Sequence, residues 1–369
     1  MMLKDHATPA GTADYANGFT AYKGNYRPML GMSISSVGIG TYLGDEDAAT
    51  DAAYAEALRA AVIGGINLVD TAVNYRCQRS ERVIGNVIAE LTSGGQVRRE
   101  QIVVATKGGY IAFDGEVPAN PRSWFEENFL RPGIVKPNEV VQGSHCMTPQ
   151  YLEAMLDISR SNLGLESIDI YYVHNPETQL SAVGREEFLT RIRKAFEFLE
   201  SAVDAKKIVC YGTATWNGFR IKPNERGYLS LMELISAATD VAGASHHFKI
   251  IQLPYNLAMT EALTLRNQAL PGGNLVSLLA AADAMGVAVC ASASLLQGQL
   301  TSRLPEILQS TFPGMQSDAQ RSIQFVRSTP GIGVALVGMS SAVHVTQNLE
   351  ALKHPPALEA LMKLFTPAD

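Results

Sequence analysis

The sequence has 369 residues, of which 46% are hydrophobic and 18% are charged, and its formal net charge is −6. This composition predicts a globular chain with enough apolar side chains for a sizeable core, and the mildly acidic balance without a basic stripe argues against a nucleic-acid partner. No stretch reaches the roughly 18 consecutive apolar residues of a membrane span, so no membrane partner is expected.

The first 25 residues are expected to form a mobile segment ahead of a single domain over residues 26–369. The stretch 1–17 is polar and rich in Ala, Gly and Asp, without the charged-then-apolar pattern of a signal peptide. Residues 26–34 then predict a short hairpin or a plug of the domain.

Apolar strand-like runs and helical patterns alternate through the rest of the chain. The runs end at Gly40, Asp70, Thr106, His174, Gly212, Gln252, Ala291 and Gly338. The helical patterns cover about 48–64, 79–92, 148–164, 185–204, 228–243, 274–285, 317–328 and 341–353. Eight strands, each followed by a helix, predict an α/β fold of the closed (β/α)8 TIM barrel type. A doubly wound open sheet is the alternative, but it favours a third glycine in the turn after the first strand, which Gly38-Ile39-Gly40 lacks.

Three connections are too long for simple turns between a barrel strand and its helix: 108–147, 216–227 and 257–273. All three follow strand ends, so they are expected to overhang the carboxyl-terminal mouth of the barrel. Long loops in a compact domain are usually functional or disordered. Because Trp124 and Phe125 give it aromatic bulk, the first is predicted to be a packed, lid-like insertion.

Four polar residues stand at or just beyond the ends of three predicted strands: Asp70, Tyr75, Lys107 and His174. Carboxyl ends of strands are where βα-barrel enzymes hold their chemistry. Tyrosine has an ordinary pKa of about 10, and a nearby cation lowers that pKa. With Lys107 as the cation, Asp70 holding Lys107, and His174 orienting a substrate oxygen, the set predicts an enzyme. Its Tyr75 would transfer a proton with a pKa lowered by about two units.

Each of these four residues also has a simpler interpretation. Asp70 fits a helix cap, Lys107 a solvent-facing amine, and Tyr75 and His174 ordinary packing. The coincidence of four strand-end positions favours catalysis.

The four cysteines, Cys77, Cys146, Cys210 and Cys290, form no Cys-x-x-Cys pair and no metal-ligand spacing, so no metal site is predicted. Cys210 and Cys290 are expected to be buried thiols within strands. For Cys77 and Cys146 the sequence leaves two places possible, the core or the pocket. Reduced cysteines predict a cytoplasmic location.

The run Asp70-Thr71-Ala72-x-x-Tyr75, followed by Ser80-Glu81-x-x-Ile84-Gly85, resembles the catalytic signature of the aldo-keto reductase family. Further matches, from about residue 26 to residue 352, include Gly38-x-Gly40-Thr41-Tyr42, Thr106-Lys107 and Tyr172-Val173-His174. The resemblance implies a catalytic tetrad of Asp70, Tyr75, Lys107 and His174. It also implies hydride transfer between a nicotinamide cofactor and an aldehyde, ketone or sugar, with Tyr75 as general acid/base.

The resemblance further implies NADP as the cofactor, with NAD as the alternative, bound without a Rossmann domain. In a barrel, the loops after strands 7 and 8 commonly hold phosphate groups at helix N-termini. The implied cofactor-binding residues are Gly40, Thr41, Tyr42, Asp70, Asn175, Thr215, Gln252, Ser292, Leu295, Gln297, Gly298, Gly338, Ser340, His344 and Asn348.

Several positions depart from the family pattern. His344 stands where many members carry an Arg that grips the 2′-phosphate of NADP, and a neutral imidazole holds a dianion less tightly than a guanidinium does. Ser340 offers a further donor, which favours NADP. Ser292 replaces the usual aromatic residue that stacks on the nicotinamide. Arg76 replaces a common Gly and is expected to point to solvent, with an anionic substrate group as the alternative.

Two other functions stay open at the level of sequence. One is a regulatory subunit that binds the cofactor on the same barrel, a part that some family members play beside membrane proteins. The other is a barrel hydrolase or lyase that uses Asp70 and His174. The expected partner is a small carbonyl compound or a sugar, and the insertion 108–147 favours a sugar. Nothing in the sequence indicates an oligomeric state.

Overall fold

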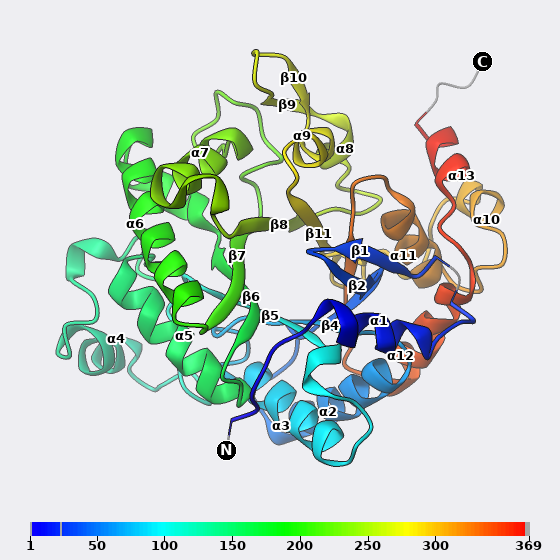
Figure 1. Ribbon diagram of the computed structural model, residues 1–369, viewed down its shortest axis with the longest axis horizontal. Coiled ribbons are helices and arrows are strands. Elements are labelled where there is room, and N and C mark those ends of the chain that lie inside the picture. Colours follow the sequence, from blue (N-terminus) through cyan, green and yellow to red (C-terminus); the bar gives the residue numbers. More distant parts are fainter. Residues whose placement is uncertain (1, 23, 366–369) are drawn as a thin grey trace.

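The computed structural model describes residues 2–22 and 24–365, and its centre is a closed barrel of eight parallel strands (Figure 1). Each strand pairs in parallel with the next, and the last two close the ring between β8 and β3. The barrel strands are β3 (Val37–Gly40), β4 (Leu68–Asp70), β5 (Val103–Gly108), β6 (Ile168–His174), β7 (Ile208–Ala214), β8 (Phe248–Pro254), β11 (Ala288–Ser292) and β12 (Val334–Gly338). The predicted (β/α)8 barrel is confirmed.

A helix follows each barrel strand and covers the outside of the barrel. These helices are α2 (Ala48–Ile63), α3 (Arg79–Ser93), α5 (Pro149–Leu163), α6 (Arg185–Asp204), α7 (Leu231–Ala242), α9 (Leu278–Ala284), α11 (Asp318–Ser328) and α12 (Ala342–Leu349). In α6, Phe188, Ile192 and Phe196 recur at helical spacing and are buried against the strands. The helices therefore form because one apolar stripe of each has the barrel wall to pack on.

A hairpin of β1 (Tyr26–Met29) and β2 (Met32–Ser35) plugs the barrel, as the sequence predicts. Met29, Met32 and Ile34 are buried in one cluster with inward-facing strand residues such as Leu68 and Ile170. Since this cluster fills the amino-terminal end, a cavity is left to form at the other end of the strands.

The predicted mobility of residues 1–25 is wrong for most of this segment, of which residues 1 and 23 lie outside the described residues. Helix α1 (Pro9–Asn17) packs on the barrel, and its Tyr15 is buried, with the hydroxyl donating to the carbonyl oxygens of Val62 and Ile66. Ala7 N donates to Asp169 Oδ1 at 2.6 Å. A polar composition concealed these contacts because they depend on partners far along the chain.

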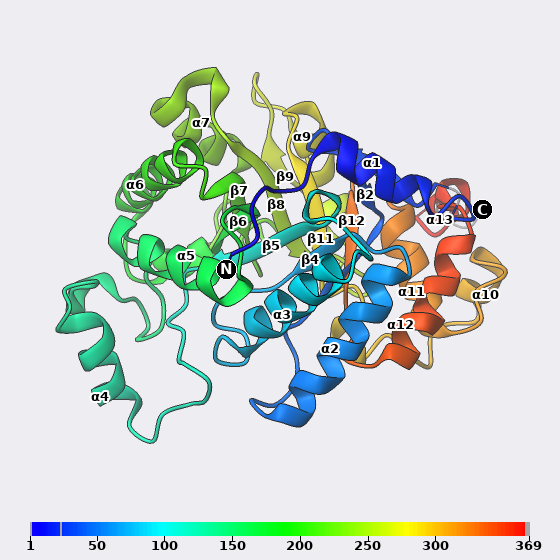
Figure 2. The same ribbon diagram turned by 60° about the horizontal axis from the view of Figure 1, so that its bottom comes forward.

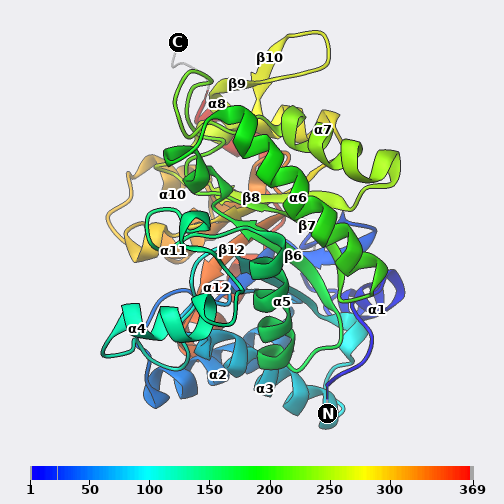
Figure 3. The same ribbon diagram turned by 90° about the vertical axis from the view of Figure 1, so that its left-hand side faces the viewer.

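Several strand ends and one helix differ from the sequence-based bounds. Four strands run one or two residues further than predicted, because Gly108, Ala214, Pro254 and Ser292 still pair in register with neighbouring strands. Within the predicted loop and helix around residue 274, a hairpin of β9 (Arg266–Ala269) and β10 (Leu275–Ser277) forms instead. Figure 3 shows this hairpin projecting beyond the barrel.

The insertion 108–147 contains α4 (Pro121–Phe125), a turn of π-helix (Glu126–Leu130) and a short 3-10 helix (Pro137–Glu139). In Figure 2 its α4 region stands away from the barrel. Phe129, Val135 and Tyr151 of helix α5 belong to a separate buried cluster beneath it. The insertion therefore has its own small core and packs on α5.

The remaining short helices lie at the periphery: α8 (Glu261–Thr264), α10 (Ile307–Thr311) and α13 (Leu358–Lys363). Within the part of the chain that the structure describes, none of the helices has the length and apolarity needed to cross a membrane.

Candidate active site

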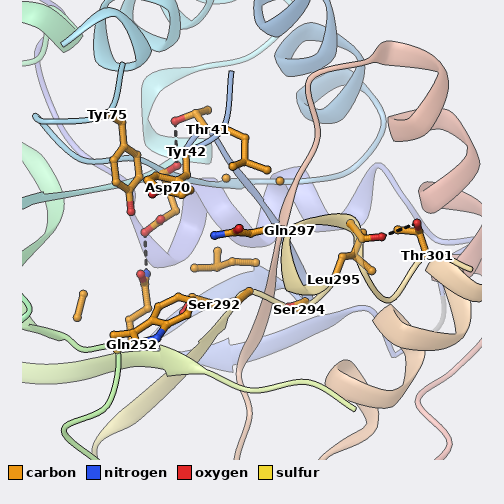
Figure 4. A pocket seen from close by; sticks show the side chains of 18 of the residues that line it. Thr41, Tyr42, Asp70, Tyr75, Gln252, Ser292, Ser294, Leu295, Gln297 and Thr301 are labelled. Carbon is orange, nitrogen blue, oxygen red and sulfur yellow. Dashed lines mark hydrogen bonds between the residues drawn. The ribbon is translucent and has the colours of Figure 1, made fainter. Parts of the chain in front are cut away.

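The carboxyl ends of the barrel strands open into a cavity of about 960 Å³. This volume lies toward the upper end of the roughly 300–1,000 Å³ that small-molecule sites occupy. Its wall combines strand ends with the loops that follow them, from Gly40 at the end of β3 to Asn348 in α12. Figure 4 shows Tyr75, Asp70 and Gln252 grouped in one part of the cavity, with Leu295 and Thr301 in another.

Asp70 and Lys107 form a buried ion pair at the ends of β4 and β5. Lys107 Nζ lies 2.6 Å from Asp70 Oδ1 and donates a second bond to the Thr71 carbonyl oxygen at 2.8 Å. The other carboxylate oxygen accepts from Gln252 Nε2 at 2.8 Å, the contact drawn in Figure 4. Burial lowers the pKa of Lys107, and Asp70 opposes that shift. As a unit the pair carries no net charge, so it sits in the barrel without an isolated buried ion.

Tyr75 reaches the same place from a turn beyond β4. Val73 N donates to the Lys107 carbonyl oxygen at 3.2 Å, and Tyr75 N donates to the Ala72 carbonyl oxygen at 3.0 Å. In Figure 4 the tyrosine hydroxyl points toward the Asp70 carboxylate. Lys107 Nζ lies 5.1 Å from the centre of the Tyr75 ring. The phenol and the ammonium that the sequence singled out are therefore neighbours.

A left-handed backbone segment after Tyr75 sets this turn. Arg76, Cys77 and Gln78 all have positive φ, which is strained for residues other than glycine. The Arg76 side chain is buried, donating from Nε to the Asp45 carbonyl oxygen at 2.8 Å and pairing with Asp51 at 2.7 Å. The expectation that Arg76 points to solvent is wrong, because its guanidinium ties the turn to the start of α2.

The expected direction of the Tyr75 pKa is also wrong. Burial raises the pKa of Tyr75 well above its ordinary value, and the negative charge of Asp70 adds to the shift. The charge of Lys107 does not outweigh these two effects, because Asp70 already pairs with it. Tyr75 is therefore a protonated phenol at neutral pH, ready to donate its proton.

His174 ends β6, and its ring meets the Tyr75 ring edge-on at 5.9 Å between centroids. Burial, and then the charge of Lys107, lower the pKa of His174 well below its ordinary value. Its Nδ1 is buried and has no hydrogen-bond partner among the described residues. A neutral imidazole with free hydrogen-bonding capacity thus stands beside the phenol.

The structure brings nearly all of the predicted residues together. Asp70, Tyr75 and His174 line the cavity, and Lys107 lies directly behind Asp70. The exception is Ser340, which is exposed and lies outside the lining. The predicted cofactor-binding residues that line the cavity are Gly40, Thr41, Tyr42, Asp70, Asn175, Thr215, Gln252, Ser292, Leu295, Gln297, Gly298, Gly338, His344 and Asn348.

Among the described lining residues, a hydroxyl and an accepting amide oxygen lack partners and fit a polar ligand such as a dinucleotide. Thr215 Oγ1 and Asn74 Oδ1 are buried and have no partner within the described residues, so they await a polar ligand. In the loop after β11, Ala293, Leu296 and Gln297 have positive φ, a strain that is common where a loop is shaped for a ligand. Among the described lining residues there is no Lys or Arg.

Several lining residues escaped the sequence-based prediction. Asn74 lies next to Tyr75 and was a visible candidate, whereas Tyr110, Ser317 and Thr301 enter the cavity through long loops. His145 of the insertion contacts the end of β6, and this contact had no signal in the sequence.

The four cysteines are free and buried. None of them lines the cavity, and Cys146 belongs to the core of the insertion. Among the described residues, no cluster of three or more His, Cys, Asp or Glu side chains is arranged to hold a metal ion.

Comparison with known proteins places this site in a family context. The family model described as "Aldo/keto reductase family" matches residues 36–224. Aldo-keto reductase YhdN of Bacillus subtilis (strain 168) is 26% identical over 193 residues, which are 51% of this chain and 45% of that protein. The chain thus matches less than half the length of this curated relative.

Solved structures agree on the fold. An aldo/keto reductase from Klebsiella pneumoniae in complex with NADP and acetate is 20% identical, with a TM-score of 0.61 over 94% of this chain and 96% of that one. Aldo-keto reductase AKR11C1 from Bacillus halodurans, in its holo form, has a TM-score of 0.60 at 20% identity over 92% and 96% of the two chains. The glycerol dehydrogenase AKR11B4 from Gluconobacter oxydans has a TM-score of 0.61 at 19% identity over 94% and 98%.

Proposed function

This chain belongs to the aldo/keto reductase family, and we propose that it is an NADP-dependent oxidoreductase that interconverts a carbonyl group and an alcohol. The observation that carries the proposal is the shared location of a protonated phenol, a neutral imidazole and a buried ammonium–carboxylate pair at one end of a large cavity. A hydrolase or lyase based on Asp70 and His174 fits less well, because both Asp70 oxygens are already engaged.

The residues of the site divide the work as follows. The cofactor, when bound, supplies the hydride that reduces the carbonyl carbon. Tyr75 donates its proton to the carbonyl oxygen, so that the C=O group becomes an alcohol and Tyr75 becomes a phenolate. Lys107 stabilises that phenolate, and Asp70 holds Lys107 in place. His174 orients the carbonyl oxygen by hydrogen bonding.

The residues that would hold the cofactor come from three places along the cavity. Gln252 and Asn175 lie near the reacting end, and Gln297 extends into the cavity in Figure 4. His344 and Asn348 in α12 lie on its wall. The relatives solved with NADP or NADPH support NADP as the cofactor.

We infer a small-molecule substrate and a cytoplasmic location. The free, buried cysteines support a reducing compartment. A sugar is a candidate substrate because hydroxyl and amide groups supply much of the polar lining of the cavity. In this proposal the packed insertion over residues 108–147 is part of a single barrel domain and reaches the cavity through Tyr110.

Replacing Tyr75 by Phe tests the assignment. General acid catalysis contributes roughly 10²–10⁴-fold to rate, so Tyr75→Phe is expected to lower kcat by at least about 100-fold on any carbonyl substrate. NADPH fluorescence on binding should change as in the wild type, because the ring is kept. Turnover is followed as loss of absorbance of the reduced nicotinamide.

The matched control is Tyr211→Phe in β7, which removes a hydroxyl that donates to Glu200 of α6, away from the cavity. It should leave kcat unchanged. Near wild-type turnover in Tyr75→Phe would show that another group supplies the proton.

A further inference from the structure

The two ends of the insertion are hydrogen-bonded to each other next to the barrel. Cys146 N donates to the Gly109 carbonyl oxygen at 2.8 Å, and Ile111 N donates to the Ser144 carbonyl oxygen at 2.8 Å. Tyr110 and His145 thereby lie opposite each other in an antiparallel bridge. The two ends of the insertion are fixed together directly beside the end of β6.

His145 joins this base to the active site. It is fully buried, and its Nε2 lies 2.7 Å from the His174 carbonyl oxygen. Gln179 Nε2 donates to its Nδ1 at 2.8 Å, and Arg191 donates to Gln179 Oε1 at 2.6 Å. Since Nδ1 accepts a hydrogen bond, Nε2 carries the hydrogen and donates it to His174. The peptide between His174 and Asn175 is therefore held from the insertion side.

Tyr110 is the residue of the insertion that lines the cavity in the described part of the chain. Its ring packs edge-on against His174 at 5.0 Å and against His145 at 5.2 Å between centroids. Its carbonyl oxygen accepts from the Tyr151 hydroxyl at 2.6 Å. With ring and backbone both held, the phenol has little freedom to move.

The hydrogen-bonding state of the Tyr110 hydroxyl follows from its contact with Asn175, its one hydrogen-bond partner among the described residues. Asn175 Nδ2 donates to Tyr110 Oη at 3.0 Å. A phenol has one hydrogen to donate, and this contact uses only acceptor capacity. The hydrogen of Tyr110 is therefore left to donate to a ligand in the cavity, which Tyr110 lines together with Tyr75 and His174.

A second group in the lining complements this donor. Asn74 Oδ1 is buried and without a partner in the described part of the chain, and Asn74 also lines the cavity. A buried amide oxygen without a donor is costly, so it favours a ligand that brings an N–H or O–H group. Both oxygens of the one carboxylate in the described lining are already engaged. The two free groups, a phenol hydrogen and an amide oxygen, thus suit a hydroxyl-bearing ligand.

We propose that Tyr110 is a specificity-determining residue that donates a hydrogen bond to a hydroxyl group beside the reacting carbonyl of the substrate. The substrate class is then hydroxylated carbonyl compounds, and simple aliphatic aldehydes are poor substrates. Asn74 accepts from the same substrate or from the cofactor amide. The inference rests on the proposed reductase function, and the insertion serves it by fixing Tyr110 through His145.

The test compares two three-carbon aldehydes that differ in their hydroxyl groups. Glyceraldehyde and propanal are each reduced with NADPH by the wild type and by Tyr110→Phe, and kcat/KM is measured. A site built to bind a substrate hydroxyl discriminates against the analogue that lacks it. Tyr110→Phe is expected to lower kcat/KM for glyceraldehyde by about 10-fold and to change that for propanal by less than about 2-fold. The ratio of variant to wild type cancels the different hydration of the two aldehydes.

The remaining outcomes separate the inference from the proposed function. An equal loss for both aldehydes in Tyr110→Phe overturns the specificity role and leaves the reductase assignment standing. Should Tyr110→Phe fail to fold, the wild type alone decides, because a preference for propanal over unhydrated glyceraldehyde overturns the inference. Turnover of neither aldehyde by the wild type overturns both. The Tyr211→Phe control should leave both values unchanged.

Discussion

Replacing Lys107 by Met separates what the buried ion pair does for stability from what it does for turnover. In the wild type the Asp70 carboxylate is buried, with Lys107 on one oxygen and Gln252 on the other. Lys107→Met keeps most of the side-chain volume but leaves that carboxylate without a countercharge. Breaking a buried pair in this way costs roughly 3–5 kcal/mol.

The expected change in Tm follows from this free-energy cost and the unfolding entropy, which scales with the number of residues. An unfolding entropy of about 2.1 cal/mol/K per residue, applied to 369 residues, gives a fall in Tm of about 4–6 °C for Lys107→Met. Thermal unfolding followed by circular dichroism measures it. The double variant Lys107→Met with Asp70→Asn removes the stranded charge, so it should regain at least about half of the lost Tm. Turnover should stay lost in both variants.

The control is a pair of the same type on the surface. Arg59 pairs with Glu90 at 2.7 Å, and both side chains are well exposed to solvent. Solvent screens such exposed pairs, and they contribute little to stability, so Arg59→Met should shift Tm by no more than about 1 °C. A Lys107→Met shift as small as this control, or a double variant no more stable than Lys107→Met, would refute the reasoning about the buried carboxylate.

Two further predictions concern histidines. His344→Arg places a guanidinium in a lining where the described residues offer no Lys or Arg. The Kd of NADPH should therefore fall by about 10-fold, while the Kd of NADH changes by less than about 2-fold. Fluorescence titration measures both constants, and an equal fall in the two would contradict a contact with the 2′-phosphate. The second prediction concerns His145, whose pKa is lowered to about 4 by burial. As the pH falls below about 6.5, His145 takes up a proton in the unfolded chain before it does so in the folded protein. Stability of the folded protein that is present above pH 6.5 is therefore lost as the pH falls toward 4. At pH 5 the loss in unfolding free energy from this group is roughly 2 kcal/mol. The Tm of His145→Gln should therefore fall less between pH 7 and pH 5 than the Tm of the wild type. Equal falls in Tm would show that another group causes the acid sensitivity.

The barrel could be predicted from sequence because each strand is an apolar run that ends in a polar or small residue. Asp70, Lys107 and His174 are such endings, and closure of the barrel brings them to one mouth. The strand bounds were less accurate, because pairs such as His174 with Ala214 continue the ladder beyond the apolar run. Pairing between strands has no local signature in the sequence.

The parts that the sequence did not predict depend on contacts between distant residues. Tyr15 makes α1 a packed helix through carbonyl oxygens about fifty positions away. His145 reaches His174 across the insertion, and Tyr110 meets Asn175 in the same way. The aromatic residues of the insertion predicted that it is packed. The hydrogen bonds between its two ends, which the sequence did not predict, bring Tyr110 and His145 to the active site.

The error in the predicted Tyr75 pKa has a physical cause that bears on the proposed reaction. Sequence reasoning expected Asp70 to hold Lys107 but left out the burial of Tyr75 and the opposing charge of Asp70, which in the structure pairs with Lys107 at 2.6 Å. Before reaction, burial keeps the phenol of Tyr75 protonated and the imidazole of His174 neutral. Net charge at this end of the cavity then arises only as Tyr75 gives up its proton, and Lys107 is the group placed to meet it. An interaction that strengthens only as charge develops lowers the barrier without tightening the ground state. A phenol with a raised pKa beside a paired ammonium is therefore consistent with an acid catalyst, and within the pair Lys107, rather than Asp70, is the group that stabilises the phenolate.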